Sequence, residues 1–404
     1  MMQGKEIVLG ITGGIAAYKS AELVRELVKR GARVHVIMTR SAREFITPLT
    51  LQTLSGNAVF TELFKLYEEQ EIGHISLAQR AQVLLIAPAT ANIIGKIAHG
   101  IADDVLSTVV MATKAPLLMA PAMNEAMWDN PVVQDNIKAL QKRGCRFIDP
   151  GWGDLACGTQ GKGRMADLAD IIDELEALLS VQDFAGKKVL VTAGPTRERL
   201  YPVRFISNPS SGKMGYAIAR AFRLRGAQVT LVSGPTSITP PRAVHYIPVE
   251  SAEEMRTAVG KYFKDASIVV KAAAVGDYRP EKAAAQKIKK KDAALELRLE
   301  RTRDILAELG KKKGQKILVG FAAETGNVKA HAAEKLKEKN LDLIVANDVS
   351  KQGIGFGSDV NEVQLIFRDG RVETLTSRPK DEIAHSILDS ILSLAKKQKL
   401  NPKN

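Results

Sequence analysis

Short apolar runs alternate with longer amphipathic segments along most of this 404-residue chain, and this alternation restricts the possible folds more than any other feature. In the first half, strands are predicted at residues 6–12, 33–39, 83–89 and 116–121, and helices at 15–30, 91–98, 103–113, 131–143 and 167–180. In the second half, strands are predicted near 188–193, 228–233, 267–273, 316–321 and 341–346, and helices near 213–225, 251–263, 302–309, 327–339 and 379–397. Such alternation is typical of α/β proteins, so the sequence predicts two doubly wound, Rossmann-like domains built on parallel sheets.

The boundary between the two predicted domains lies near residues 181–186, after an acidic amphipathic helix and before the next apolar run. We therefore expect domains at 1–185 and 186–404. Both open with an apolar strand that runs into a glycine turn, at Gly13 and at Gly194. Residues 361–375 break the pattern, and the Asp369-Gly370 dipeptide within them predicts the turn of a β-hairpin.

The formal net charge of +13 is concentrated in the second predicted domain. Residues 1–185 hold 18 of the 58 Lys and Arg residues and 21 of the 45 Asp and Glu residues, so the excess of positive charge lies entirely in 186–404. Such an excess favours a phosphate-rich partner, either a nucleic acid or a nucleotide. Two cysteines make no disulfide framework, and the chain has neither an apolar run of membrane-spanning length nor a leader pattern. A soluble, cytoplasmic protein is expected.

In the first half, small and polar residues follow the predicted strands. Gly13–Lys19 opens a helix, where glycines let backbone N–H groups approach a phosphate. The spacing is not that of a dinucleotide fingerprint, so a mononucleotide is favoured, although a tight turn also uses glycines. Asn124 lies in the strand-end loop Pro121–Trp128, where it is either a helix cap or an amide offered to a substrate carboxylate.

The segment Gly151–Met165 has five glycines in fifteen residues, so we expect a mobile flap without regular structure. Cys157 lies in this flap near Lys162 and Arg164, where a thiol is suited to proton transfer.

In the second half, Ile206–Gly215 precedes a helix and is either a phosphate or carboxylate site or a plain serine-capped helix. It is not a P-loop. Lys271–Tyr278 places small residues and Asp277 at a strand end, leaving room for a base or ribose. Lys287–Lys291 carries four lysines in five residues and is either a solvated loop or a clamp for a triphosphate.

These motifs resemble those of two known enzyme families. The loops Gly13–Lys19, Pro121–Trp128 and Gly151–Met165 look like those of flavin-containing cysteine decarboxylases, and the second half looks like phosphopantothenate–cysteine ligases. Over residues 5–397 the motifs occur in the order found in the bifunctional decarboxylase–ligases of coenzyme A synthesis.

The resemblance implies a flavodoxin-like first domain that binds FMN through Gly13, Gly14, Ile15, Thr39, Ser41, Asn92 and Ser107. His74 matches the active-site histidine of the family, Asn124 the ligand of the substrate carboxylate, and Cys157 the proton donor. The flavin would oxidise the substrate thiol so that the carboxylate gains an electron sink, and it would be restored after CO₂ is lost.

For the second domain, the resemblance implies a CTP-dependent ligase that forms an acyl-cytidylate from 4′-phosphopantothenate and passes the acyl group to L-cysteine. Asn208 matches the asparagine associated with the acyl-cytidylate, and Lys287 the key lysine of its loop. The implied CTP contacts are Ala272, Ala273, Asp277, Lys287, Arg303, Asp304, Ile305, Leu306, Phe321, Lys335 and Lys339. Mg²⁺ is expected with the triphosphate, held mainly by phosphates and water, because the sequence shows no dedicated metal ligands.

The sequence departs from the family pattern at three positions, with Gly14 in place of a common Ser, Tyr201 in place of Asp and Arg303 in place of Pro. The resemblance also implies a homo-oligomer with a trimeric decarboxylase core, flavin sites between subunits and dimeric ligase domains. The expected partners are small-molecule substrates, with neither a nucleic acid nor a membrane. A basic nucleic-acid-binding protein and a catalytically silent flavoprotein are the competing interpretations.

Overall fold

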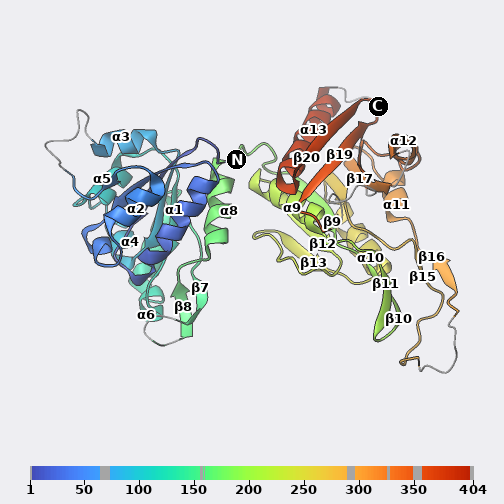
Figure 1. Cartoon of the computed structure of the whole chain (residues 1–404), viewed down its shortest axis with the longest axis horizontal. Helices are drawn as coiled ribbons and strands as arrows, with labels where there is room; N and C mark the ends of the chain where they lie inside the picture. The colour runs from blue at the N-terminus through green and yellow to red at the C-terminus, as the bar shows by residue number, and fades with distance from the viewer. Residues whose placement is uncertain are drawn as a thin grey trace. The chain divides into compact units, whose positions relative to one another are not determined.

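The computed structural model describes residues 2–63, 73–154, 158, 160–288, 296–324, 328–348 and 357–400. The chain forms two compact units, Met1–Ser180 and Val181–Asn404 (Figure 1), so the division falls slightly before the predicted one at 185.

Unit 1 is built on a six-stranded sheet in the order β3-β2-β1-β4-β5-β6, in which every neighbouring pair is parallel. Its strands are β1 (Glu6–Ile11), β2 (Arg33–Met38), β3 (Val59–Phe60), β4 (Val83–Ala89), β5 (Leu117–Pro121) and β6 (Arg146–Phe147). Its helices are η1 (Ile15–Tyr18), α1 (Lys19–Lys29), η2 (Arg40–Glu44), α2 (Pro48–Ser55), α3 (Gly73–Arg80), α4 (Ala91–Ala98), α5 (Val105–Ala112), α6 (Glu125–Trp128), α7 (Pro131–Lys142) and α8 (Leu168–Leu179). The strand order reverses at β1 and β4, which makes this sheet doubly wound and opens a crevice at their carboxyl ends.

Both faces of this sheet are covered by helices, which explains why the strands are continuous apolar runs. Side chains alternate along β1, so Leu9 joins a core with residues of α1 and α8, such as Leu23 and Leu175. Val8 points to the other face and joins residues of α4 and α5, such as Ile94 and Leu106. The predicted α/β architecture of the first half is therefore confirmed.

Unit 2 contains an eight-stranded sheet in the order β13-β12-β9-β14-β17-β18-β19-β20. The pairs from β13 to β18 are parallel, and β18, β19 and β20 pair antiparallel. Its strands are β9 (Lys188–Ala193), β12 (Gln228–Ser233), β13 (His245–Pro248), β14 (Ile268–Lys271), β17 (Ile317–Glu324), β18 (Leu343–Asp348), β19 (Val360–Phe367) and β20 (Val372–Pro379). Its helices are α9 (Lys213–Leu224), α10 (Ala252–Phe263), α11 (Ile305–Lys311), α12 (Val328–Glu338) and α13 (Lys380–Leu400). The predicted hairpin is confirmed as β19 and β20, and Gly370 in its turn has a φ of +87°.

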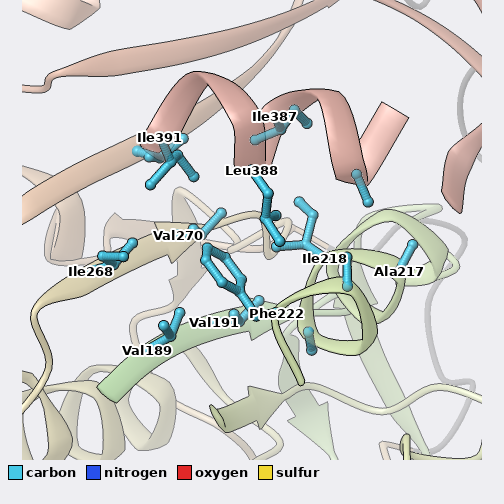
Figure 2. Close-up of a cluster of buried hydrophobic side chains, with 14 of the residues drawn as sticks. Val189, Val191, Ala217, Ile218, Phe222, Ile268, Val270, Ile387, Leu388 and Ile391 are labelled. Carbon is cyan, nitrogen blue, oxygen red and sulfur yellow. The ribbon is translucent and has the colours of Figure 1, made fainter. Parts of the chain in front are cut away.

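Helices α9 and α13 cover one face of this sheet. Figure 2 shows Phe222 of α9 and Leu388 of α13 packed with Val191 of β9 and Val270 of β14. The opposite face is covered by α10, α11 and α12, whose apolar residues share a core with Leu190, Val269 and Leu318. Alternate residues of β14 therefore face different helices.

Three two-stranded sheets complete the units: β7 (Gly151–Asp154) with β8 (Gln160–Arg164), β10 (Arg197–Tyr201) with β11 (Arg204–Ser207), and β15 (Tyr278–Pro280) with β16 (Leu299–Arg301). The expectation that the glycine-rich segment 151–165 forms no regular element was wrong, because β7 and β8 pair as a hairpin there. Its glycines permit close packing instead: a Cβ on Gly163 would lie 2.2 Å from the Met123 carbonyl oxygen, and one on Gly161 2.3 Å from Glu125 Cδ. None of the helices within the described ranges is both long and apolar enough to cross a lipid bilayer.

Candidate functional site

A cavity of about 1160 Å³ lies in unit 1 at the carboxyl ends of the parallel strands. Seven predicted site residues line it: Gly13, Gly14, Ile15, Thr39, Ser41, Asn92 and Asn124. They come from four separate loops, which the strand order brings together at the point where the sheet reverses direction. This is where a doubly wound sheet places a nucleotide-like ligand.

Two contacts fix the walls of this cavity. The buried Thr12 at the end of β1 donates a hydrogen bond to the Pro88 carbonyl oxygen at 2.7 Å and accepts one from the Thr90 N–H at 3.2 Å, which ties the ends of β1 and β4 together. A Cβ on Gly13 would lie 2.3 Å from Ser41 Cβ, so the glycine allows the first two loops to touch.

The residues of this cavity fit a flavin. Thr39 Oγ1 is buried and has no hydrogen-bond partner in the part of the chain that the structure describes. An unsatisfied buried hydroxyl costs about 1–3 kcal/mol, which a ligand oxygen at this position would recover. Apolar side chains of Ile15, Met123 and Met127 line the same cavity and suit the flat ring of an isoalloxazine.

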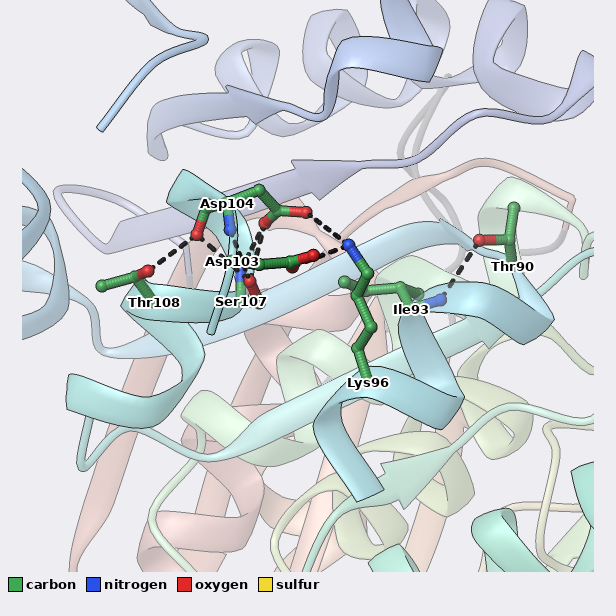
Figure 3. Close-up of polar contacts among 7 residues, drawn as sticks. All are labelled: Thr90, Ile93, Lys96, Asp103, Asp104, Ser107 and Thr108. Atoms are coloured by element: carbon green, nitrogen blue, oxygen red, sulfur yellow. Dashed lines mark hydrogen bonds and ion pairs between the residues drawn. The ribbon is translucent and has the colours of Figure 1, made fainter. Parts of the chain in front are cut away.

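A charged cluster forms the wall next to α4 and α5 (Figure 3). Lys96 Nζ lies 2.7 Å from Asp103 Oδ1 and 3.4 Å from Asp104 Oδ2, and all three residues line the cavity. The hydrogen bond to Asp103 raises the pKa of Lys96, and the same bond lowers the pKa of Asp103. The lysine is therefore held charged at this wall.

Ser107, predicted to contact FMN, is not among the residues that line the cavity. Its side chain is buried and its Oγ donates to Asp104 Oδ1 at 2.9 Å. Asp104 in turn accepts from the Ser107 N–H at 2.8 Å, so the two residues form a capping box at the start of α5. The hydroxyl is used within its own helix, and the FMN contact of Ser107 stays a prediction.

The other predicted residues of unit 1 are placed differently. Asn124 caps α6, with Oδ1 accepting from the Ala126 N–H at 2.8 Å, and it also lines the cavity, so the two interpretations are compatible. His74 lies in the first turn of α3 (Gly73–Arg80) and does not line the cavity, and its buried Nδ1 has no partner among the described residues. Cys157 lies outside the described residues.

The hairpin β7–β8 that flanks Cys157 is packed onto α6. Glu125 Oε1 accepts from the Lys162 N–H at 3.2 Å, and Lys162 Nζ lies 5.4 Å from the centre of the Trp128 ring. Asp154 and Arg164 of the hairpin line the cavity. The glycine-rich segment therefore borders the predicted flavin site although it is not an irregular flap.

A second cavity of about 580 Å³ lies in unit 2, again at the carboxyl ends of parallel strands. Eleven predicted residues line it: Asn208, Ala272, Ala273, Asp277, Arg303, Asp304, Ile305, Leu306, Phe321, Lys335 and Lys339. Asn208 is held toward the loop after β14 by a hydrogen bond from Nδ2 to the Val275 carbonyl oxygen at 3.4 Å. Lys287 is exposed and does not line the cavity, and Lys289–Lys291 lie outside the described residues.

The N-terminus of α9 opens at this cavity. Its N-cap is Gly212, with a φ of +80° and no side-chain cap, so N–H groups of the first turn have no capping side chain. Gly215 allows the helix to lie against β9, because a Cβ there would be 2.6 Å from Ala193 Cβ. Uncapped N–H groups at a helix N-terminus suit an anion.

Several cations surround the second cavity. Lys213 Nζ lies 2.6 Å from Asp359 Oδ1, and Lys380 Nζ donates to the Ser358 carbonyl oxygen. Burial lowers the pKa of Lys380 and, more strongly, that of Lys271, to about 8. Burial is the largest single influence on Asp304 and opposes its ionisation, but its hydrogen bonds with Lys339 and the Ala307 N–H and the charges of Lys339 and Lys271 together lower its pKa. This concentration of positive charge suits a polyphosphate.

Among the polar residues that line the second cavity, sequence reasoning gave no role to Lys271 and did not name Asn347, Asn361 or Lys380. A lysine that ends an apolar strand was a usable signal for Lys271, because it follows three buried residues. The other three come from β18, β19 and α13, far along the chain, and only the sheet topology brings them in. Asn347 Oδ1 is buried without a partner among the described residues. The described ranges hold no cluster of three or more His, Cys, Asp or Glu suited to a metal ion.

Comparison with known families defines the class of each unit. The profile of the family described as Flavoprotein matches residues 1–180. The profile described as DNA/pantothenate metabolism flavoprotein C-terminal domain matches residues 184–394. The protein is therefore a flavoprotein unit fused to a pantothenate-metabolism unit.

Relatives that match nearly the whole chain extend this assignment. The coenzyme A biosynthesis bifunctional protein CoaBC of Bacillus subtilis (strain 168) is 48% identical over 400 residues, covering 98% of each chain. The protein of the same name from Escherichia coli (strain K12) is 45% identical over 397 residues, covering 97% of this chain and 98% of its own. The chain belongs to the family of coenzyme A biosynthesis bifunctional proteins.

Solved structures match parts of the chain. The C-terminal domain of a coenzyme A biosynthesis bifunctional protein CoaBC is 44% identical, with a TM-score of 0.47, and the match covers 54% of this chain and 99% of that one. A PPC decarboxylase mutant complexed with pantothenoylaminoethenethiol is 30% identical, with a TM-score of 0.40, and the match covers 44% of this chain and 99% of that one.

Proposed function

We propose that the two cavities divide the two activities of this bifunctional enzyme of coenzyme A biosynthesis. The cavity of unit 1 binds FMN and decarboxylates 4′-phosphopantothenoylcysteine to 4′-phosphopantetheine. The cavity of unit 2 uses CTP to join 4′-phosphopantothenate to L-cysteine. One observation carries this proposal: in each unit, residues predicted from scattered motifs line a single cavity at the carboxyl ends of the strands.

In unit 1 the glycine turn at Gly13 and the loop from Thr39 to Ser41 would hold the flavin, and a flavin oxygen would give the hydroxyl of Thr39 a partner. The bound flavin supplies the oxidation of the substrate thiol that gives the carboxylate an electron sink. Asn124 binds the substrate carboxylate from the N-terminus of α6. Cys157, which lies between β7 and β8 in the sequence, gives a proton to the product.

In unit 2 the carboxylate of 4′-phosphopantothenate attacks the α-phosphorus of CTP, which releases pyrophosphate and forms an acyl-cytidylate. The cysteine amine then displaces CMP. Both steps build negative charge on phosphate or carbonyl oxygens, which cations around the cavity stabilise. Lys213, Lys335 and Lys339 line the cavity, and Asn208 supplies an amide donor. Mg²⁺ enters with the triphosphate, bound mainly by phosphates and water.

Lys287 is proposed to contact the triphosphate, although its exposed position puts it outside the cavity of the described residues. His74 is likewise proposed for a site completed by a neighbouring subunit, which is consistent with its position away from the cavity of its own chain. Both assignments rest on the family resemblance.

A homo-oligomer in the cytoplasm completes the proposal, with a trimeric core of unit 1 and dimers of unit 2. Exposed apolar side chains support it. In unit 2 they lie on or next to the strand pairs β10–β11 and β15–β16, where Val203 is 63% exposed and Phe205 46% exposed. In unit 1, Ile15 and Tyr18 are more than half exposed beside the cavity, where a neighbouring subunit would cover them. Sedimentation of the full chain and of each unit tests this arrangement.

The deciding experiment is incubation with 4′-phosphopantothenate, L-cysteine, CTP and Mg²⁺, following CMP and CO₂ separately. Both products are expected, from a preparation that carries flavin. The proposal is contradicted if neither CMP nor CO₂ is formed. The competing nucleic-acid function predicts tight binding to DNA with a steep dependence on salt, and no nucleotide turnover.

A further inference from the structure

Lys271 ends β14 and points into the second cavity. Side chains alternate along a strand, so Lys271 lies on the same face as Val269, the face covered by α11 and α12. It is the only charged residue of this strand, whose other members are Ile268, Val269 and Val270. An apolar strand thus delivers one amino group to the floor of the cavity.

The charged groups around Lys271 come from three segments: Asp304 at the start of α11, with Arg303 before it; Lys335 and Lys339 of the α12 region; and Asp277 after β14. The carboxylate of Asp304 is already engaged. Its Oδ2 lies 2.9 Å from Lys339 Nζ and its Oδ1 accepts from the Ala307 N–H at 3.0 Å. Within the described ranges, the side-chain amine of Lys271 forms no hydrogen bond or ion pair.

The Lys271 amine is therefore a partly exposed group of the cavity without a direct partner among the described side chains, and the carboxylate of Asp304 nearby is already paired with Lys339. Burial is the main cause that lowers its pKa to about 8; Asp304 and Asp277 favour its charged form, and Lys339 opposes it. Near pH 8 about half of the molecules carry a neutral amine at this position. An anionic or carbonyl oxygen placed beside it favours the charged form.

We propose that Lys271 is a proton-linked contact of the bound nucleotide: its amine takes up one proton from solvent as CTP binds, and the resulting ammonium binds a nucleotide oxygen. This inference rests on the proposed CTP site of unit 2 and adds a residue and a proton to it. The step balances in atoms and charge, because a neutral amine and a solvent proton give an ammonium and no bond of the nucleotide changes.

The test is titration calorimetry of CTP with Mg²⁺ into the full chain, in two buffers of different ionisation enthalpy at pH 8. The difference in heat gives the number of protons taken up, which we expect to be about 0.5 at pH 8 and about 0.1 at pH 7. Lys271→Met should lose this uptake and bind CTP at least several-fold more weakly. Lys271→Arg keeps a permanent charge, so it should bind CTP but take up no proton. Lys311→Met, an exposed lysine of α11, is the matched control and should behave as the wild type.

The outcomes separate the inference from the function on which it rests. CTP binding without proton uptake in the wild type, or uptake that persists in Lys271→Arg, overturns the inference and leaves the CTP site standing. No binding of CTP to the wild type overturns the proposed function itself. Separate titrations with inorganic triphosphate and with cytidine show which part of CTP contacts Lys271. Proton uptake should accompany binding of only the part whose oxygen reaches the amine.

Discussion

Lys339 and Asp304 form an ion pair across the second cavity, with Nζ and Oδ2 2.9 Å apart. The pair connects the residue that follows α12 to the N-cap of α11, although 34 positions separate them in the sequence. Asp304 thereby serves two purposes, since its Oδ1 also accepts from the Ala307 N–H. Two residues that were predicted separately as CTP contacts are thus directly paired with each other.

Removal of the Asp304 carboxylate should lower the free energy of unfolding of unit 2. Asp304→Ala loses the helix cap and the ion pair, and we expect a loss of about 1–2 kcal/mol at pH 7 in urea unfolding. Asp304→Asn keeps a side chain that can cap the helix, so its free energy of unfolding should fall by less. Because the folded-state pKa of Asp304 is lowered, its charge stabilises the protein above the unfolded-state pKa and this contribution disappears as pH falls through the folded-state value. The difference between wild type and Asp304→Asn should therefore shrink in acid; a difference that grew would contradict the assignment.

Lys96 should support the flavin site through its position between Asp103 and Asp104. Lys96→Met leaves two adjacent carboxylates uncompensated at the cavity wall, so we expect reduced flavin content per chain with only a small change in thermal stability. Flavin absorbance after gel filtration measures the flavin content per chain. Lys114→Met, at an exposed lysine, is the control. Equal flavin content in both variants would show that the cluster does not shape the site.

Two glycines inside helices should respond oppositely to alanine. In Gly215→Ala the new Cβ meets Ala193 Cβ at 2.6 Å and the Thr192 carbonyl oxygen at 3.0 Å, so overpacking should cost about 1–3 kcal/mol. Gly260 lies in α10 with nothing within 4 Å of the added methyl group. Gly260→Ala should therefore stabilise unit 2 by about 0.5–1 kcal/mol. Thermal unfolding of both variants is the measurement, and a stabilised Gly215→Ala would refute the packing described for α9 on β9.

Cys157→Ser should separate the two activities. We expect CMP release to continue while CO₂ loss proceeds without completion of the reduced product, so an oxidised decarboxylated intermediate accumulates and is detected by mass spectrometry. Loss of CMP release in this variant would show that the two reactions do not occupy separate units.

Lys287→Gln should give the opposite pattern. CMP formation is lost, because the lysine is proposed to bind the triphosphate, while CO₂ is still released from added 4′-phosphopantothenoylcysteine. Lys282→Gln, a nearby exposed lysine, is the control and should keep both activities. Normal CMP formation by Lys287→Gln would remove this residue from the ligase site.

Much of the site could be predicted from the sequence because strand-end loops in a doubly wound sheet all lie at one edge. Gly13, Thr39 and Asn92 are far apart in the chain, yet each follows a strand of the same parallel sheet, and all three line one cavity. Ser107 does not line this cavity, because its hydroxyl donates to Asp104 in the helix cap, and its contact with FMN stays a prediction. The prediction of an irregular flap failed because glycines near Met123 and Glu125 serve close packing of a hairpin.

The sequence by itself determined the two α/β units and the chemistry of their loops, because periodicity and turn residues act over short distances. Tertiary structure decided which side chains share an environment. Side chains alternate along β14, and α11 and α12 cover one face of its sheet, so Lys271 lines the same cavity as Asp304 and Lys339. The pKa of a lysine depends on loss of water and on charges several ångströms away, and the tertiary structure sets both. Lys271, which the sequence shows only as the last residue of an apolar strand, therefore becomes a titratable group of the cavity.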